Sequence, residues 1–162
     1  MFQNEVEILY AEDNPTDVEL TLFALRRSRL ANSIHIARDG AEALDYLFCR
    51  GAFSSRDFSA PKFVLLDLKL PKVDGIEALK AIRQDERTKM IPVVVMTSSK
   101  EQKDLVESYK LHVNSYIQKP IDFDQFQQVV EQLGLYWLVV NQAPPAETLD
   151  QAGPNSIGAV TK

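Results

Sequence analysis

Residues 63–75 read FVLLDLKLPKVDG, and the fold class can be inferred from them. The first four residues are all apolar, which is typical of a short strand buried on both faces of a sheet. Asp67 ends the predicted strand, and Asp74-Gly75 then supplies an N-cap and the first residue of a helix. A buried strand that leads into a helix is the repeating unit of a parallel sheet.

The same unit recurs along the rest of the chain. Short apolar segments predict four more strands, strongly at residues 6–10 and 91–96 and more weakly at residues 33–37 and 115–118. Between these segments apolar residues recur every three or four positions, as on one face of a helix, for example at Val18, Leu22 and Leu25. Five strands that alternate with five helices predict an α/β fold, with a doubly wound parallel sheet and right-handed crossovers.

Composition limits the class of protein. The 162 residues suffice for one domain, and 45% hydrophobic with 25% charged residues is typical of a globular protein. A net charge of −5 without a dense Lys/Arg run argues against nucleic-acid binding. No apolar run approaches the roughly 20 residues of a membrane helix, and residues 1–5 do not resemble a signal peptide. The single Cys49 cannot form an internal disulfide. We therefore expect a cytoplasmic protein with no membrane partner.

Two segments lie outside the alternation of strands and helices. Residues 49–61 are expected to form an extended loop before the third strand. Residues 141–162 are rich in Ala, Pro, Gly, Asn and Gln and show almost no periodicity. We expect one domain over residues 1–142 and a C-terminal tail over residues 143–162 that forms no separate domain.

Polar residues follow the predicted strands at their carboxyl ends, where an open parallel sheet binds its ligands. The first strand leads to Glu12-Asp13, the third to Asp67, the fourth to Thr97 and the fifth to Lys119. Two carboxylates ~4 Å apart repel by roughly 4 kcal/mol at an effective dielectric of 20, and a divalent cation such as Mg²⁺ relieves that repulsion. Carboxylates with a nearby ammonium and hydroxyl also suit phosphoryl transfer, in which a carboxylate can be the nucleophile.

Each of these residues alone also has a simpler explanation. Glu12-Asp13 could belong to a turn that starts a helix, and Asp67 could be an ordinary acid at a strand end. Threonine is common in β-branched strands such as the one that ends at Thr97, and Lys119 could be a solvated surface charge. Their joint placement at four strand ends of one sheet favours a shared site.

Four motifs in this order resemble those of response regulator receiver domains, over about residues 5–140. Residues 8–15 (ILYAEDNP) resemble the acidic opening of that family, and residues 64–75 resemble its phosphoacceptor strand with the Pro and Asp-Gly that follow. Residues 93–98 (VVVMTS) and 115–120 (SYIQKP) resemble the other two motifs. The resemblance implies a flavodoxin-like (βα)5 fold with strand order 2-1-3-4-5. It also implies a regulatory phosphoprotein rather than an enzyme, limited to Mg-dependent self-phosphorylation and autodephosphorylation.

The resemblance assigns roles to the residues of the site. Asp67 would accept a phosphoryl group from a phosphohistidine of a sensor histidine kinase. Asp13, Asp67 and the backbone carbonyl of Lys69 would bind Mg²⁺ or another divalent cation. Glu12 would contribute to this metal site through a water molecule.

A conformational switch is implied by the same resemblance. Lys119 and Thr97 would bind the phosphoryl oxygens on Asp67, and the movement of Thr97 would let Tyr116 change its rotamer. The surface around the fourth helix, the fifth strand and the fifth helix would then change. A cis peptide bond between Lys119 and Pro120 is also implied.

Three features resemble the phytochrome-associated receivers in particular, which act without an output domain. They are the long loop before Asp67, the Leu70-Pro71-Lys72 segment and residues 91–95 (IPVVV). The upstream partner would then be a phytochrome-type histidine kinase, and the input would be light. The downstream partner would be a phosphorelay or target protein, reached by protein–protein contact within a two-component regulatory system.

The last predicted helix carries more apolar residues than one sheet-facing stripe requires. All of residues 133–140 are apolar except Gly134. The surplus predicts a homodimer, and the alternative is that the tail folds back over the same surface. The residues expected at the dimer surface are Leu135, Tyr136, Trp137 and Val139.

Other functions agree less well with the motifs. Haloacid dehalogenase-type hydrolases have an Asp-x-Asp pattern at the nucleophile. This chain has Lys69 two residues after Asp67, so the second acid is missing. A flavin site would need a phosphate-cradling loop after the first strand, where Glu12-Asp13 would repel a phosphate. A phosphorylation-independent interaction module on the same fold remains the alternative.

Overall fold

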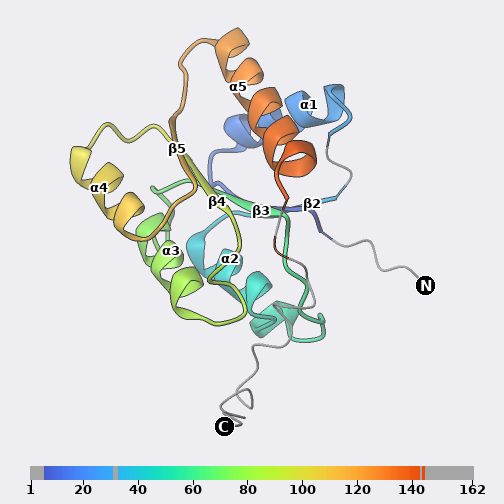
Figure 1. Cartoon of the computed structure of the whole chain (residues 1–162), viewed down its shortest axis with the longest axis vertical. Coiled ribbons are helices and arrows are strands. Elements are labelled where there is room, and N and C mark those ends of the chain that lie inside the picture. The colour runs from blue at the N-terminus through green and yellow to red at the C-terminus, as the bar shows by residue number, and fades with distance from the viewer. Residues whose placement is uncertain (1–5, 31–32, 143, 145–162) are drawn as a thin grey trace, which may run out of the picture.

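The computed structural model describes residues 6–30, 33–142 and 144. Five strands form one parallel sheet in the order β2-β1-β3-β4-β5 (Figure 1). This confirms the predicted flavodoxin-like topology. The strands are β1 (Ile8–Ala11), β2 (Ile34–Ala37), β3 (Phe63–Leu66), β4 (Val93–Thr97) and β5 (Ser115–Gln118).

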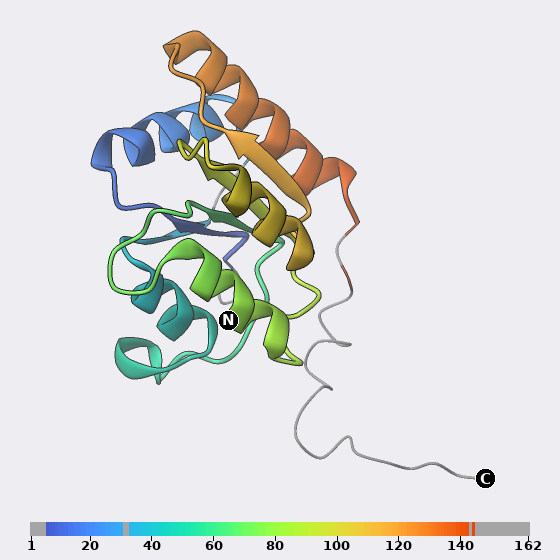
Figure 2. The ribbon, with the colours of Figure 1, turned by 90° about the vertical axis from the view of Figure 1, so that its left-hand side faces the viewer.

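Helices cover both faces of the sheet. α1 and α5 lie on one face and α2 and α3 on the other, with α4 beside α3 (Figures 1 and 2). The α-helices are α1 (Pro15–Arg27), α2 (Gly40–Leu47), α3 (Gly75–Gln84), α4 (Gln102–Lys110) and α5 (Phe123–Leu135). A 3-10 turn, η1 (Gly51–Phe53), follows α2, and a π-helical turn, η2 (Tyr136–Val140), continues α5.

The core consists of two apolar layers, one on each face of the sheet. Alternate residues of the central strands β1, β3 and β4 point into one layer or the other, and every residue of these strands is buried. Burial on both faces is the physical reason for their continuous apolar runs. The edge strands β2 and β5 are mostly half-buried, which explains their weaker signal in the sequence.

Helix starts set the geometry at the carboxyl ends of the strands. The side chain of Asn14 accepts hydrogen bonds from the backbone N–H groups of Thr16 and Asp17, and Asp74 caps α3 in the same manner. Gly75 begins α3 directly behind the site, and a Cβ there would clash with the backbone carbonyl of Asp67. Glycine is therefore required for α3 to begin so close to Asp67.

The segment between α2 and β3 is a loop apart from η1, and Arg56 holds it together. The guanidinium of Arg56 donates to the carbonyl of Tyr46 at 2.9 Å, to the Cys49 sulfur at 3.1 Å and to the carbonyl of Ser59 at 3.1 Å. The guanidinium also lies 3.9 Å from the centre of the Tyr46 ring. The predicted loop is thus ordered by side-chain contacts rather than by further regular structure.

The peptide bond before Pro120 differs from the expected one. The bond between Lys119 and Pro120 is trans, so the expected cis bond was wrong; the trans form is the one ordinarily favoured, by about 0.5–1 kcal/mol at X-Pro bonds. No helix within the described ranges is long and apolar enough to cross a membrane. The predicted tail lies outside the described residues apart from residue 144, as do residues 1–5 of the predicted domain.

Candidate functional site

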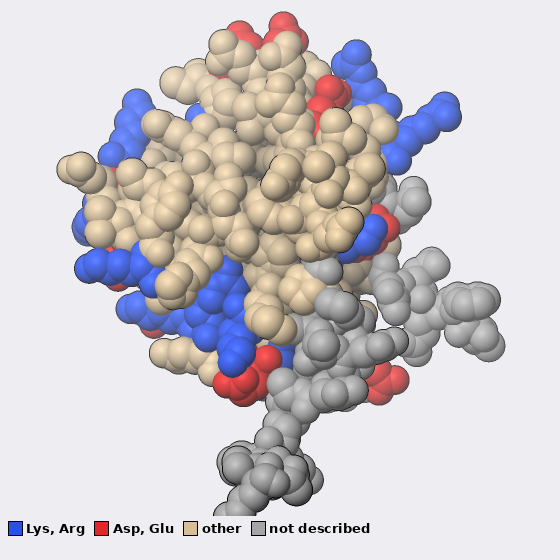
Figure 3. Space-filling view, in the orientation of Figure 1, with Lys and Arg blue, Asp and Glu red and all other residues tan. Residues whose placement is uncertain are grey.

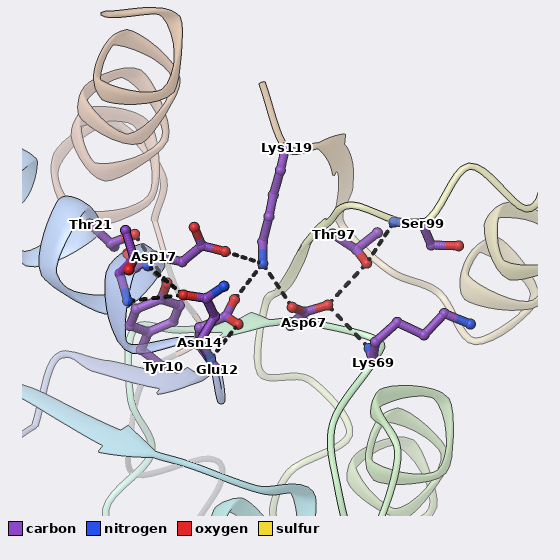
Figure 4. Close-up of polar contacts among 11 residues, drawn as sticks. Tyr10, Glu12, Asn14, Asp17, Thr21, Asp67, Lys69, Thr97, Ser99 and Lys119 are labelled. Carbon is purple, nitrogen blue, oxygen red and sulfur yellow. Dashed lines mark hydrogen bonds and ion pairs between the residues drawn. The ribbon is translucent and has the colours of Figure 1, made fainter. Parts of the chain in front are cut away.

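The polar residues predicted at strand ends meet at one edge of the sheet (Figure 4). Ala11 of β1 pairs with Leu66 of β3, so the residues that follow, Glu12 and Asp67, emerge side by side. Thr97 is the last residue of β4, and Lys119 follows the last residue of β5. Parallel pairing thus brings together residues that are far apart in the sequence.

Among the described residues, Lys119 is the only side-chain cation in contact with the carboxylates of Glu12 and Asp67. Its Nζ lies 2.6 Å from Glu12 Oε2, 2.8 Å from Asp17 Oδ2 and 2.8 Å from Asp67 Oδ2. Burial opposes the charge of this ammonium, but the hydrogen bonds to Asp17, Asp67 and Glu12 outweigh burial and raise the pKa of Lys119. Lys119 is therefore a fixed positive charge at physiological pH.

Glu12 is the most deeply buried carboxylate of the site, with 1% of its surface exposed. Burial and the neighbouring Asp67 raise its pKa to about 7, against the opposing effects of Lys119 and the Asn14 N–H. Ionised Glu12 is thus costly beside Asp67, and the one ammonium does not fully compensate the local negative charge.

Asp67 is buried, and both of its carboxylate oxygens are held. Oδ1 accepts a hydrogen bond from Thr97 Oγ1 at 3.0 Å and another from the Lys69 backbone N–H at 3.1 Å. Oδ2 accepts from Lys119 at 2.8 Å. These three donors fix the orientation of the Asp67 carboxylate. They would also face the negative charge that develops when a group is attached to one of its oxygens.

Three carboxylates form a cluster that could hold a metal ion. Glu12, Asp13 and Asp67 each offer one oxygen, and these oxygens lie within 4.8 Å of one another. Asp13 is exposed, so the cluster is open to solvent on that side. Hard oxygen donors, an open side and the raised pKa of Glu12 all fit a divalent cation. The part of the Lys69 carbonyl in such a site stays a prediction.

Tyr116 lies on β5, the strand that leads to Lys119. Its hydroxyl is buried near the Ser99 side chain without a hydrogen bond of good geometry to any described residue, and its ring packs against the core layer on the α2–α3 face. Burial first, and then the charge of Asp104, raise the pKa of this phenol. The predicted aromatic therefore points inward in this structure.

Two acids near the site were missed by sequence reasoning. Asp17 was not among the predicted site residues, yet it binds Lys119. Asp104 of α4 accepts a hydrogen bond from Ser99 Oγ at 2.6 Å and lies 3.5 Å from Lys69 Nζ. Asp17 lies in the first turn of α1, the helix that follows Glu12 and Asp13, and this closeness in sequence is the signal that could have identified it.

The expected dimer surface lies at the end of α5 and in η2. Leu135, Tyr136 and Val139 are about half or more exposed, at 49%, 50% and 63%. Trp137 is half-buried against the core layer on the α1–α5 face, with its ring 5.0 Å from that of Tyr136. Three of the four residues are therefore available at the surface, and the fourth anchors the turn.

The model of the response regulator receiver domain family matches residues 8–131 of this chain. The chain belongs to the response regulator receiver family. Two curated relatives are similar to this receiver over most of their length. The probable methanogenesis regulatory protein FilR2 of Methanothrix harundinacea is 44% identical over 137 residues, which cover 85% of this chain and 86% of FilR2. Response regulator Rcp1 of Synechocystis sp. is 37% identical over 139 residues, or 86% of this chain and 93% of Rcp1.

Solved structures show the same receiver architecture. The phosphorylated cyanobacterial phytochrome response regulator RcpA has a TM-score of 0.80 and 38% identity, covering 87% of this chain and 99% of RcpA. The Mn(2+)-bound form of Rcp1 has a TM-score of 0.79 and 36% identity, covering 85% of this chain and 98% of that one. The predicted family and fold are thereby confirmed.

Proposed function

We propose that this receiver accepts a phosphoryl group on Asp67 from a phosphohistidine of a sensor histidine kinase. The observation that carries the proposal is the buried Asp67 carboxylate, held by Lys119, Thr97 and the Lys69 N–H beside a carboxylate cluster. An Asp67 oxygen would attack phosphorus and form a P–O bond. The P–N bond would break, and its electron pair would stay on the imidazole nitrogen of the kinase.

The acidic cluster is proposed to hold Mg²⁺ during this transfer. Asp13, Asp67 and the Lys69 carbonyl would be its ligands, with Glu12 acting through water. A bound divalent cation supplies neutralisation of charge on the phosphoryl oxygens. The Mn(2+)-bound state of the relative Rcp1 supports a divalent cation at such a site. Self-phosphorylation from small donors and autodephosphorylation would be the protein's own chemistry.

The response to phosphorylation is proposed to begin at Thr97. Its hydroxyl donates to Asp67 Oδ1 and would transfer this hydrogen bond to a phosphoryl oxygen, as Lys119 would transfer one of its own. A shift of Thr97 would change the space available to Tyr116, whose hydroxyl makes no hydrogen bond of good geometry to the described residues. The two arrangements would exchange, and phosphorylation would change their populations.

The input is proposed to be a phytochrome-type sensor kinase. The similarity to RcpA and Rcp1 supports it, because RcpA is a phytochrome response regulator. The similarity to FilR2 supports a different input, since FilR2 is a probable methanogenesis regulatory protein. Phosphotransfer from a purified phytochrome kinase, compared with a kinase of another input class at equal concentration, distinguishes the two: faster transfer from the phytochrome kinase supports the proposal.

The output is proposed to be protein–protein contact, including a homodimer. Figure 3 shows a broad surface over α5 and β5 with few charged side chains. Exposed apolar side chains continue from α5 into η2 at Leu135, Tyr136, Val139 and Val140. A symmetric dimer would cover this surface. Sedimentation of the wild type and Val139→Asp tests it: a monomeric wild type would overturn the dimer, and a variant that stays dimeric would overturn this surface as its interface.

Incubation with Mg²⁺ and acetyl phosphate, followed by intact mass measurement, tests the proposed function. The wild type is expected to gain one phosphoryl group, and Asp67→Asn and EDTA-treated protein are expected to gain none. A folded wild type that gains nothing would favour the alternative, a phosphorylation-independent interaction module on the same fold. Asp13→Asn serves as a matched variant, because it removes a proposed metal ligand and leaves the phosphoacceptor in place.

A further inference from the structure

The Lys119 ammonium has a carboxylate partner that phosphoryl transfer to Asp67 does not itself require. Its Nζ lies 2.8 Å from Asp17 Oδ2, the same distance as to Asp67 Oδ2. Figure 4 shows Asp17 approaching the ammonium from the side opposite Asp67. An ammonium has three N–H donors, and three carboxylates, including Glu12, surround this one. All donors of Lys119 are thus engaged.

The backbone of Asp17 is held by hydrogen bonds in the first turn of α1. Its backbone N–H donates to Asn14 Oδ1 at 3.2 Å, and its carbonyl accepts from the Tyr10 hydroxyl at 3.4 Å. That hydroxyl also pairs with Thr21 Oγ1 at 3.1 Å. The positive end of the α1 dipole favours the negative charge of Asp17. The backbone that carries the Asp17 carboxylate is therefore held in place by contacts other than the one to Lys119.

Asp17 differs from the other two partners of Lys119 in its further contacts. Glu12 and Asp67 belong to the carboxylate cluster that could hold a cation, and Asp17 does not. Asp67 also loses its carboxylate charge when one of its oxygens carries a phosphoryl group. The hydrogen bond between Asp17 and Lys119 therefore depends neither on cation binding nor on phosphorylation of Asp67.

We propose that Asp17 is a positioning residue, which keeps the Lys119 ammonium beside Asp67 while the phosphoryl group is transferred. This inference rests on the proposed function of Asp67. Without Asp17, one N–H of Lys119 would turn to solvent, and the flexible four-carbon stem would leave the ammonium less fixed. Small displacements of a charged group at a reaction centre slow the reaction strongly.

Pseudo-first-order phosphorylation by acetyl phosphate and Mg²⁺, measured by intact mass, tests this role. Asp17→Ala is expected to react about tenfold more slowly, as for the loss of one charge-assisted hydrogen bond. Asp17→Asn keeps an acceptor oxygen and is expected to recover the rate to within about threefold of wild type. Glu19→Ala removes the same charge from an exposed position of α1 and is the matched control, expected to react at the wild-type rate.

A second readout follows Lys119 directly. The ¹⁵N resonance of its ammonium is expected in the wild type and Asp17→Asn, where three acceptors slow proton exchange, and is expected to be lost in Asp17→Ala. If Asp17→Ala shows no cooperative unfolding transition, and is therefore not folded, Asp17→Ser is measured in its place. A rate for Asp17→Ala within about twofold of wild type, or equal slowing in Glu19→Ala, would overturn the inference alone. A wild type that gains no phosphoryl group would overturn the proposed function, and this inference with it.

Discussion

Two cationic side chains of this receiver have opposite surroundings at opposite ends of its sheet. Lys119, at the carboxyl end, contacts three carboxylates. Arg83, near the end of α3, contacts neutral acceptors at the amino ends of β4 and β5. It donates at 2.8 to 3.1 Å to the Asn114 side chain and to the carbonyls of Lys89, Ile91, Leu111 and His112. Burial lowers the pKa of Arg83, whereas its carboxylate partners raise that of Lys119.

The difference separates a structural cation from one that is proposed to act in phosphoryl transfer. The acceptors of Arg83 cannot change their charge, so its hydrogen bonds only join α3 to the segments that lead into β4 and β5. The partners of Lys119 are acids, of which Asp67 is proposed to be phosphorylated and Glu12 has a pKa of about 7. Of these two cations, Lys119 is the one whose partners can change their charge in a chemical event.

Replacing Lys119 gives the largest expected effect. Lys119→Met keeps the length of the side chain and removes the charge that faces Asp67. Phosphorylation by acetyl phosphate is expected to slow by about 100-fold, the loss typical of one donor that stabilises developing charge. The time course of intact mass measures this rate. A rate within about fivefold of wild type would contradict the proposed role of Lys119 in phosphoryl transfer.

Replacing Arg83 tests whether this cation acts on stability alone. Arg83→Met is expected to lower the free energy of unfolding by about 2 kcal/mol, because several backbone carbonyls lose their donor. Its phosphorylation rate is expected to stay at the wild-type value. Urea denaturation and the acetyl phosphate assay measure the two quantities, and a slowing comparable to that of Lys119→Met would show that the two cations do not differ as proposed.

The pH dependence of stability tests the charge balance around Lys119. The pKa of Glu12 is raised from 4.5 to about 7 on folding, so folding favours its protonated form. Its contribution is fully present below pH 4.5 and is lost as the pH rises to about 7. In EDTA, the wild type is expected to lose about 1 to 3 kcal/mol more than Glu12→Gln across this range. Parallel curves would contradict the raised pKa.

The smallest expected effect concerns one acceptor of Arg83. Asn114 Oδ1 accepts from Arg83 and from the backbone N–H of Val93 at 2.8 Å. Asn114→Ala is expected to lower the free energy of unfolding by about 1 kcal/mol, since Arg83 keeps its carbonyl acceptors. Urea denaturation of the single and double variants with Arg83→Met gives the coupling energy, and strict additivity would argue against a shared network.

The strands were predictable because a strand buried on both faces consists of consecutive apolar residues. The apolar run at residues 63–66 and the weaker segment at 115–118 coincide with β3 and β5. The segment at 6–10 was placed early, since β1 runs from Ile8 to Ala11. Apolar residues report burial, whereas the ends of a strand depend on its ladder partners, here Ile34 and Phe63 beside Ile8.

The site was predictable where it follows strand ends, and less so elsewhere. Glu12, Asp67 and Lys119 were expected together because parallel strands end at one edge of the sheet. Asp17 was missed because an acid in the first turn of a helix already has a local explanation. Arg83 carries no signal, since most of its acceptors are backbone carbonyls that every residue possesses.

The identity of the phosphoacceptor is the central claim, and borohydride reduction tests it most directly. After treatment with Mg²⁺ and acetyl phosphate, reduction converts an aspartyl phosphate to homoserine, which peptide mass mapping locates in the chain. We expect homoserine at position 67 and at no other acidic position, and none when EDTA is present. Homoserine at position 13 or 17 instead, or none despite bound Mg²⁺, would contradict the assignment of Asp67.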